Sequence, residues 1–248
     1  MAAVVEASVV SVARLSPSFV RITFAGCGAV SSGGYDHRIK LLLARPGQDR
    51  PVLPEAEDWY GAWCAMPLDV RPIMRTFTIR SQDGDLLDVE FALHGDTGPA
   101  SAFARDARPG DRLGIIGASA GEERLAMHYN PGDAQSFLLA GDDTALPAVA
   151  SILEALPATA SAQVFLQVPD PADVRDLSTA ADVKVDWSVR TGLADAVRRA
   201  PLPEGTPYAW VAGESALVRD VRAYLVGERG WSAKTNYFGG YWKAGETE

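Results

Sequence analysis

Residues 136–156, SFLLAGDDTALPAVASILEAL, combine an apolar strand, a polar turn and an amphipathic helix. The first part, SFLLAG, is apolar almost throughout, which is typical of a strand buried on both faces of a parallel sheet. After the turn, apolar side chains recur at helical spacing and form one face: Leu146, Val149, Ala150, Leu153 and Leu156. A strand that leads through a short turn into a helix predicts the start of an α/β domain.

The same order of elements continues towards the C-terminus. The pattern predicts strands at residues 162–168, 183–189 and 208–213, and helices at residues 193–200 and 216–226. Strands that alternate with helices predict a parallel sheet covered by helices on both faces. The segment NYFGGYW, residues 236–242, is either one more short strand or an extended tail.

The first half of the chain has a different pattern. Turns separate short β-rich segments at residues 4–12, 19–26, 37–44, 74–80, 86–95 and 111–117, and one helix is predicted at Pro99–Ala107. Several short strands at this spacing predict an antiparallel sandwich or barrel. The turn-rich segment HYNPGD, residues 128–133, marks the change of pattern, so we predict two domains at residues 1–130 and 131–248.

Charge and composition exclude several classes of function. The chain of 248 residues carries a formal net charge of -9, which repels phosphate backbones, so no nucleic-acid partner is expected. No apolar segment approaches the roughly 20 residues that span a bilayer, and no signal peptide is visible, so no stable membrane insertion is expected. Two cysteines, Cys27 and Cys64, fit a reducing compartment, and we expect a cytoplasmic monomer.

The segment RTFTIR, residues 75–80, is the first of three candidate binding segments. On a strand, alternation places Arg75 and Phe77 on one face and Thr78 and Arg80 on the other. Without further context, the simplest interpretation is an amphipathic strand whose arginines lie in solvent.

The second candidate, LHGDTGPAS at residues 93–101, runs from a strand through a glycine turn into a helix N-terminus. Free backbone N–H groups there, beside the small Ser101, are suited to bind an anion such as pyrophosphate. The alternative is a plain connection in which Gly98 only supplies an unusual backbone angle.

The third candidate, GDDTALP at residues 141–147, follows the first strand of the α/β half, where open parallel sheets bind ligands. It contains one glycine, and the acidic pair Asp142 and Asp143 disfavours phosphate. The turn therefore suits contact with an uncharged part of a nucleotide.

Five segments, RTFTIR, LHGDTGPAS, LLAGDDTALPA, WVAGES and GGYWKAG, together resemble the siderophore-interacting protein family of the ferredoxin-reductase superfamily. They occur in the family's order, and the resemblance covers nearly the whole chain. It implies an N-terminal antiparallel flavin-binding β-barrel followed by a parallel-sheet α/β domain that binds a nicotinamide nucleotide. The activity it implies is FAD-dependent transfer of electrons from NAD(P)H to ferric siderophores, which releases Fe(II). Reduced ferredoxin stays open as an alternative donor.

The resemblance implies roles for residues of the barrel half. Arg75 would bind the pyrophosphate of FAD, while the catalytic candidates Phe77 and Thr78 would stack on the isoalloxazine ring and lie near flavin N5. Phe77 stands where tyrosine is usual in the family, so we expect weaker or altered flavin affinity. The turn before the helix would close on the pyrophosphate, and its candidates are His94, Gly98, Pro99, Ala100 and Ser101.

The resemblance also implies roles in the α/β half. Thr144 and Glu214 would meet the nicotinamide nucleotide, and the aromatic residues Tyr241 and Trp242 would lie beside the flavin, unless they only pack against the sheet. Basic residues near the flavin edge would attract an anionic ferric siderophore, and the candidates are Lys40, Lys243 and Arg38.

Other interpretations compete with this one. A flavin reductase of the same superfamily that serves another acceptor, or a non-catalytic siderophore-binding protein, would have a similar sequence. GASAG at residues 117–121 matches GxSxG, but His128 follows Ser119 too closely for a hydrolase triad, so we expect no nucleophile there. The histidines His37, His94 and His128 show no metal-ligand spacing, so no metal held by the protein itself is expected.

Overall fold

The computed structural model describes residues 2–93, 98–203, 205 and 207–245. The chain divides into two compact units, Met1–Met127 and His128–Glu248, called here the barrel unit and the α/β unit. No described helix is both long enough and apolar enough to cross a lipid bilayer.

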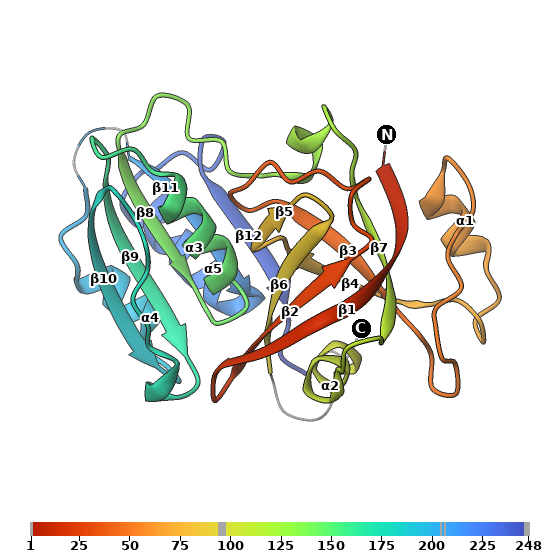
Figure 1. The fold of residues 1–248 in the computed structure, drawn as a ribbon. Helices are drawn as coiled ribbons and strands as arrows, with labels where there is room; N and C mark the ends of the chain where they lie inside the picture. The colour runs from red at the N-terminus through yellow and green to blue at the C-terminus, as the bar shows by residue number, and fades with distance from the viewer. Residues whose placement is uncertain (1, 94–97, 204, 206, 246–248) are drawn as a thin grey trace. The chain divides into compact units, whose positions relative to one another are not determined.

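The barrel unit is a curled antiparallel sheet of seven strands in the order β4-β3-β7-β1-β2-β6-β5 (Figure 1). The strands are β1 (Ala2–Ser16), β2 (Phe19–Ala25), β3 (Arg38–Leu43), β4 (Ile73–Thr78), β5 (Ser81–Asp83), β6 (Leu86–Ala92) and β7 (Arg112–Ala118). Alternate side chains of β2 and β6 point into one apolar core, which also includes residues of β3 and β7. This half-barrel confirms the predicted antiparallel architecture.

The chain that follows β4 connects the two edges of this sheet. The backbone N–H of Ile79 still donates to His37 O beside β3, at 2.9 Å, but that of Arg80 donates to Asp88 O on β6, at 2.8 Å. The next residue, Ser81, begins β5, which pairs with β6. The RTFTIR segment therefore forms backbone hydrogen bonds at both edges of the sheet, through β3 at one edge and β6 at the other.

The described part of the barrel unit contains two α-helices. Helix α2 (Pro99–Asp106) has Pro99 in its first turn, as the sequence predicted, and it buries Ala104 against the core. Helix α1 (Trp59–Ala65), in the connection from β3 to β4, was not predicted, because it is only seven residues long and buries none of them. The carboxylate of Asp58 caps α1 by accepting from Gly61 N–H at 3.0 Å.

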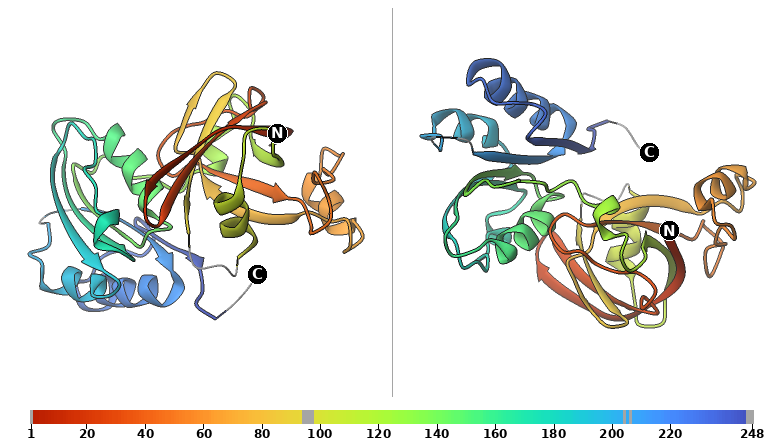
Figure 2. Two further views of the ribbon diagram at one scale, coloured as in Figure 1. Left: turned by 60° about the horizontal axis from the view of Figure 1, so that its bottom comes forward. Right: turned by 90° about the horizontal axis from the view of Figure 1, so that it is seen from above.

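The α/β unit contains a parallel five-stranded sheet in the order β10-β9-β8-β11-β12. The strands are β8 (Ser136–Gly141), β9 (Ser161–Val168), β10 (Asp182–Val189), β11 (Tyr208–Glu214) and β12 (Tyr237–Trp242). Helix α3 (Leu146–Ala155) lies on one face, while α4 (Leu193–Arg199) and α5 (Ser215–Arg222) lie on the other (Figure 2). The predicted parallel sheet is confirmed, and the NYFGGYW segment forms its last strand.

Candidate functional site

The strand β4 brings several of the predicted residues together on one face of the barrel unit. Its register with β3 places Arg38 opposite Thr78 and Lys40 opposite Thr76. The ammonium group of Lys40 donates to Thr76 Oγ1 at 2.6 Å, and Arg38 Nε donates to Ala126 O at 3.5 Å. Residues directly opposite each other share a face of the sheet, so two predicted substrate residues lie beside the predicted catalytic threonine.

Arg75 and Phe77 lie on the other face of β4. The ring of Phe77 packs against that of Phe91, with 4.5 Å between centroids and 45° between planes. Phe77 is half-buried and packs against the barrel core. Arg75 is also half-buried, lies opposite Leu41, and its Nη1 donates to Met74 O at 2.9 Å.

The buried carboxylate of Glu90 forms ion pairs with two arginines, one of which, Arg80, lies just after β4. The side chain of Glu90 is 0% exposed, and its Oε1 lies 2.6 Å from Arg21 Nη2 and 3.4 Å from Arg80 Nε. The Arg80 side chain is only 14% exposed, so the interpretation of this arginine as a solvated charge is wrong. Sequence reasoning missed Glu90 because the pairing joins strands that are far apart in the chain, and no local pattern marks it.

The N-terminus of α2 presents backbone N–H groups of the kind that bind anions. Gly98 is its N-cap, no side chain among the described residues caps it, and a Cβ built on Gly98 would meet only Ser101 Oγ, at 3.9 Å. Pro99 has no N–H group, so Ala100 and Ser101 supply the first free backbone donors. The predicted pyrophosphate residue His94 lies outside the described residues.

In the α/β unit, Asp142 connects three of the predicted residues at the carboxyl ends of β8, β11 and β12. Its Oδ1 accepts from the N–H and hydroxyl of Thr144 at 3.0 and 2.5 Å. Its Oδ2 accepts from Glu214 N–H at 2.6 Å and from Trp242 Nε1 at 2.8 Å. Gly213, with φ +133°, leaves room for this carboxylate, because an added Cβ would lie 2.6 Å from Asp142 Cγ.

The Glu214 carboxylate is engaged with the backbone. Its Oε2 accepts from Ala216 and Leu217 N–H at 2.5 and 3.0 Å, which caps α5, and its Oε1 accepts from Ala244 N–H at 3.3 Å. Desolvation opposes ionisation of this group, but these backbone donors hold the pKa of Glu214 below its ordinary value. The predicted contact of Glu214 with a nucleotide remains a prediction.

Residues of the C-terminal segment differ in exposure. Tyr241 is half-buried, and its ring meets Trp210 edge to face with 6.3 Å between centroids, which supports packing against the sheet. Trp242 is 38% exposed, and Lys243 is exposed. Whether these side chains meet a flavin or substrate stays a prediction.

The two carboxylates of the β8–α3 turn have different surroundings. Burial, the charge of Asp142 and, more weakly, that of Asp173 raise the pKa of Asp143 to about 8. Asp142 instead accepts hydrogen bonds from Thr144, the backbone of Glu214 and Trp242. The sequence predicted this pair only as an obstacle to phosphate, and no sequence signal marked Asp142 as the centre of the hydrogen-bond network.

Comparison with known proteins accounts for both units. Residues 8–121 match the siderophore-interacting FAD-binding domain, and residues 134–245 match the siderophore-interacting protein family. The ferric vibriobactin reductase ViuB of Vibrio cholerae is 33% identical over 72% of this chain and 67% of its own length.

Solved structures agree with these matches. The siderophore-interacting protein SipS from Aeromonas hydrophila superposes with a TM-score of 0.80 at 34% identity, covering 100% of this chain and 93% of that one. The ferredoxin reductase in carbazole 1,9a-dioxygenase shares the fold, with a TM-score of 0.70 at 16% identity over 97% of this chain and 70% of that one. The chain therefore belongs to the siderophore-interacting protein family and has a ferredoxin-reductase-like fold.

Proposed function

We propose that this protein is an FAD-dependent reductase that transfers electrons from NAD(P)H to ferric siderophores and so releases Fe(II). The observation that carries the proposal is the composition of β4, where Arg75, Phe77 and Thr78 lie in a siderophore-interacting FAD-binding domain. We place the reaction in the cytoplasm, where reduced nicotinamide nucleotides are produced.

The barrel unit has residues that fit FAD. The N-terminus of α2 offers the N–H groups of Ala100 and Ser101 to an anion, and the guanidinium of Arg75 has the donor geometry that pyrophosphate needs. Phe77 is half-buried and Thr78 is buried, and the residues directly after them pair with both edges of the sheet. When bound, FAD would supply a carrier that accepts two electrons together and releases them singly.

Basic side chains would position the substrate. Lys40 and Arg38 lie next to Thr78 on one face of β4 and β3, and Lys243 is exposed in the α/β unit. Ferric iron is a hard cation that oxygen ligands hold tightly, whereas Fe(II) has a lower charge density and leaves more readily. The chain therefore needs only to attract an anionic complex and orient it, while exchange of the ligands follows from the change in iron oxidation state.

The electron donor would bind at the carboxyl end of the parallel sheet, near Thr144 and Glu214. The Asp142 side chain lies in the turn before α3, and this acidic turn disfavours a phosphate. We expect an uncharged part of NAD(P)H to contact Thr144. Reduced ferredoxin is the donor if neither nucleotide reacts.

The decisive experiment is an anaerobic assay with a ferrous chelator. FAD-loaded protein, NADH or NADPH, and a ferric siderophore should give the coloured ferrous complex at a rate above a control with free FAD. Bleaching of the yellow protein by NAD(P)H without a ferrous product would favour a reductase for another acceptor. A protein that binds the siderophore but is not bleached by NAD(P)H or reduced ferredoxin would be a carrier.

A further inference from the structure

The outer strand of the α/β unit has an open edge. In the sheet order, β10 (DVKVDWSV, Asp182–Val189) has β9 on one side and no described strand on the other. Its pairing with β9 runs over all eight residues without a bulge, and the segment contains no proline. Exposed edges of this kind invite pairing with another strand unless charges or bulges prevent it.

The backbone of β10 alternates between β9 and the open side. The N–H of Asp182 donates to Ala160 O at 3.0 Å, and that of Arg190 donates to Val168 O at 2.7 Å. Even-numbered residues therefore direct their N–H and C=O groups towards β9, and odd-numbered residues direct theirs away. No backbone bond outside the sheet involves the odd residues Val183, Val185 or Trp187 in the part of the chain that the structure describes.

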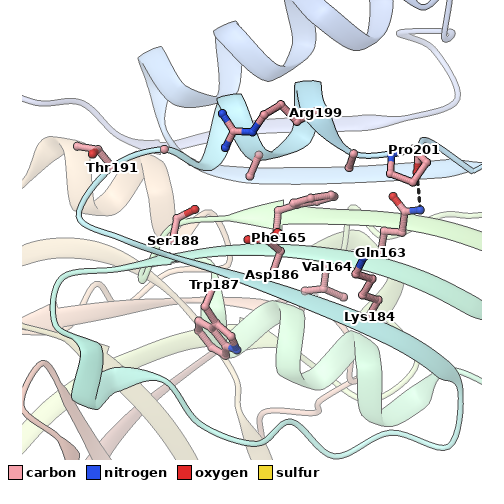
Figure 3. A pocket seen from close by; sticks show the side chains of 13 residues that line it. Gln163, Val164, Phe165, Lys184, Asp186, Trp187, Ser188, Thr191, Arg199 and Pro201 are labelled. Atoms are coloured by element: carbon pink, nitrogen blue, oxygen red, sulfur yellow. Dashed lines mark hydrogen bonds between the residues drawn. The ribbon is translucent and has the colours of Figure 1, made fainter.

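The side chains of β10 alternate as well. Asp182, Lys184 and Asp186 are exposed, whereas Val183, Val185 and Trp187 are half-buried. Lys184, Asp186 and Ser188 line a groove of about 470 Å³ between β10 and α4, and Trp187 points to the opposite side of the sheet (Figure 3). One face of the edge is therefore charged and the other is apolar.

This strand is complementary to itself in one antiparallel register. When two copies are aligned about Val185, Lys184 of each copy faces Asp186 of the other, on the groove side. On the other side, Val183 of each copy faces Trp187 of the other, a pair of β-branched and aromatic residues that favours strand pairing. A shift by one residue would place these apolar side chains opposite charged ones on the wrong face, so the register is specific.

The backbone supports the same register. Val185 would pair with its own counterpart, and the outward N–H and C=O groups at positions 183, 185 and 187 would exchange the hydrogen bonds of an antiparallel ladder. Lys184 and Asp186 would then face each other at non-hydrogen-bonded positions, where side chains approach most closely. Backbone direction, charge and apolar contacts thus agree on one arrangement.

We propose that two copies of this chain associate through β10, antiparallel and centred on Val185, to form a continuous two-fold symmetric sheet. The proposal departs from the monomer that the sequence predicted and does not depend on the reductase function. A single strand pair is smaller than a standard interface of about 1,600 Å², so the dimer should be weak and concentration-dependent, with a Kd of roughly micromolar or above.

Charge reversal tests the register in solution. Sedimentation equilibrium of the full chain over a wide concentration range should give a monomer–dimer equilibrium. Lys184→Asp and Asp186→Lys each place like charges opposite one another and should raise the Kd about tenfold. The double exchange K184D/D186K restores complementary charges and should return the Kd to within about threefold of the original. Lys234→Asp, at an exposed lysine outside β10, is the matched control and should leave the Kd unchanged.

Disulfide trapping tests the same geometry without relying on affinity. In a Cys64→Ser background, Val185→Cys places two thiols on the two-fold axis, where the expected Cα separation of about 5.5 Å suits a disulfide. Asp182→Cys places them far apart, so mild oxidation should cross-link only the first variant. A chain that stays monomeric at all concentrations, equal cross-linking of both cysteine variants, or failure of the double exchange to restore the Kd would overturn the proposal.

Discussion

The indole Nε1 of Trp242 donates a hydrogen bond to Oδ2 of Asp142 at 2.8 Å, which joins the last strand to the β8–α3 turn. The same carboxylate accepts from Thr144 and from the backbone of Glu214. One buried side chain thus fixes the loop, the helix start and the C-terminal aromatic residue that were predicted separately as binding positions. This arrangement leads to the first prediction.

Asp142→Asn should destabilise the α/β unit by about 1–3 kcal/mol, because an amide NH₂ cannot accept from Glu214 N–H or Trp242 Nε1. Urea unfolding measures the loss, and the tryptophan emission should shift as Trp242 loses its partner. Asp133→Asn removes an exposed carboxylate of the same unit and should have little effect. Equal stability of the two variants would contradict the central role of Asp142.

Asp143 should make stability depend on pH in the opposite sense to an ordinary carboxylate. Its pKa rises from 3.8 to about 8 on folding, so the native state binds the extra proton. The resulting stabilisation is present at low pH and is lost as the pH rises through about 8.

Asp143→Asn should therefore match the original protein near pH 4 and exceed its stability by about 1–3 kcal/mol above pH 8. Thermal melts of both proteins between pH 4 and 9 measure the difference. A difference that stays constant over this range would show that Asp143 ionises normally.

Glu90→Gln should cost the barrel unit about 3–5 kcal/mol, because it leaves Arg21 and Arg80 without their buried counter-charge. Glu6→Gln is the matched control: it breaks an ion pair of 2.9 Å with Arg112 on the surface and should cost less than about 1 kcal/mol. Urea unfolding compares the two. A similar loss of unfolding free energy in both variants would mean that the buried ion pairs of Glu90 stabilise the protein no more than the surface pair of Glu6.

Much of the fold was predictable, because the apolar periodicity that produces each core also appears in the sequence. The continuously apolar segment SFLLAG, followed by an amphipathic helix, indicates a parallel sheet. The short β-rich segments of the first half indicate an antiparallel sheet. Helix α1 escaped prediction because it buries no residue in a core, and only the cap by Asp58 marks where it begins.

The candidate site was predictable only in part. Family resemblance made Arg75, Phe77 and Thr78 candidates, which they remain, and the structure places Lys40 and Arg38 on the strand that pairs with theirs. Asp142 and Glu90 could not be recognised, since their partners lie far away in sequence and only the folded backbone brings them together. Long-range polar pairs leave no periodic signal in a single chain.

Phe77→Ala should weaken FAD binding about 10- to 100-fold, since it removes the stacking surface on β4. Phe77→Tyr should tighten binding by roughly two- to tenfold if a phenol hydrogen bond forms. Flavin fluorescence quenching on titration with the apoprotein measures both. Tyr60→Ala, which removes an aromatic ring 54% exposed on α1, is the control and should not change the Kd.

Because Phe77 packs on Phe91, circular dichroism must first show that the alanine variant is folded. Unchanged FAD affinity in a folded Phe77→Ala protein would place the flavin elsewhere.

Lys40→Ala and Lys243→Ala should each raise KM for an anionic ferric siderophore about three- to tenfold and leave kcat nearly unchanged, because the lysines attract the substrate but do not react. A neutral electron acceptor should show no such change. The effect should shrink at high ionic strength, where screening weakens attraction between exposed charges. Lys234→Ala removes an exposed lysine of the same protein and serves as the control. If all three variants changed KM equally, or if the neutral acceptor responded as strongly, the lysines would contribute only general charge and the siderophore would bind at another surface.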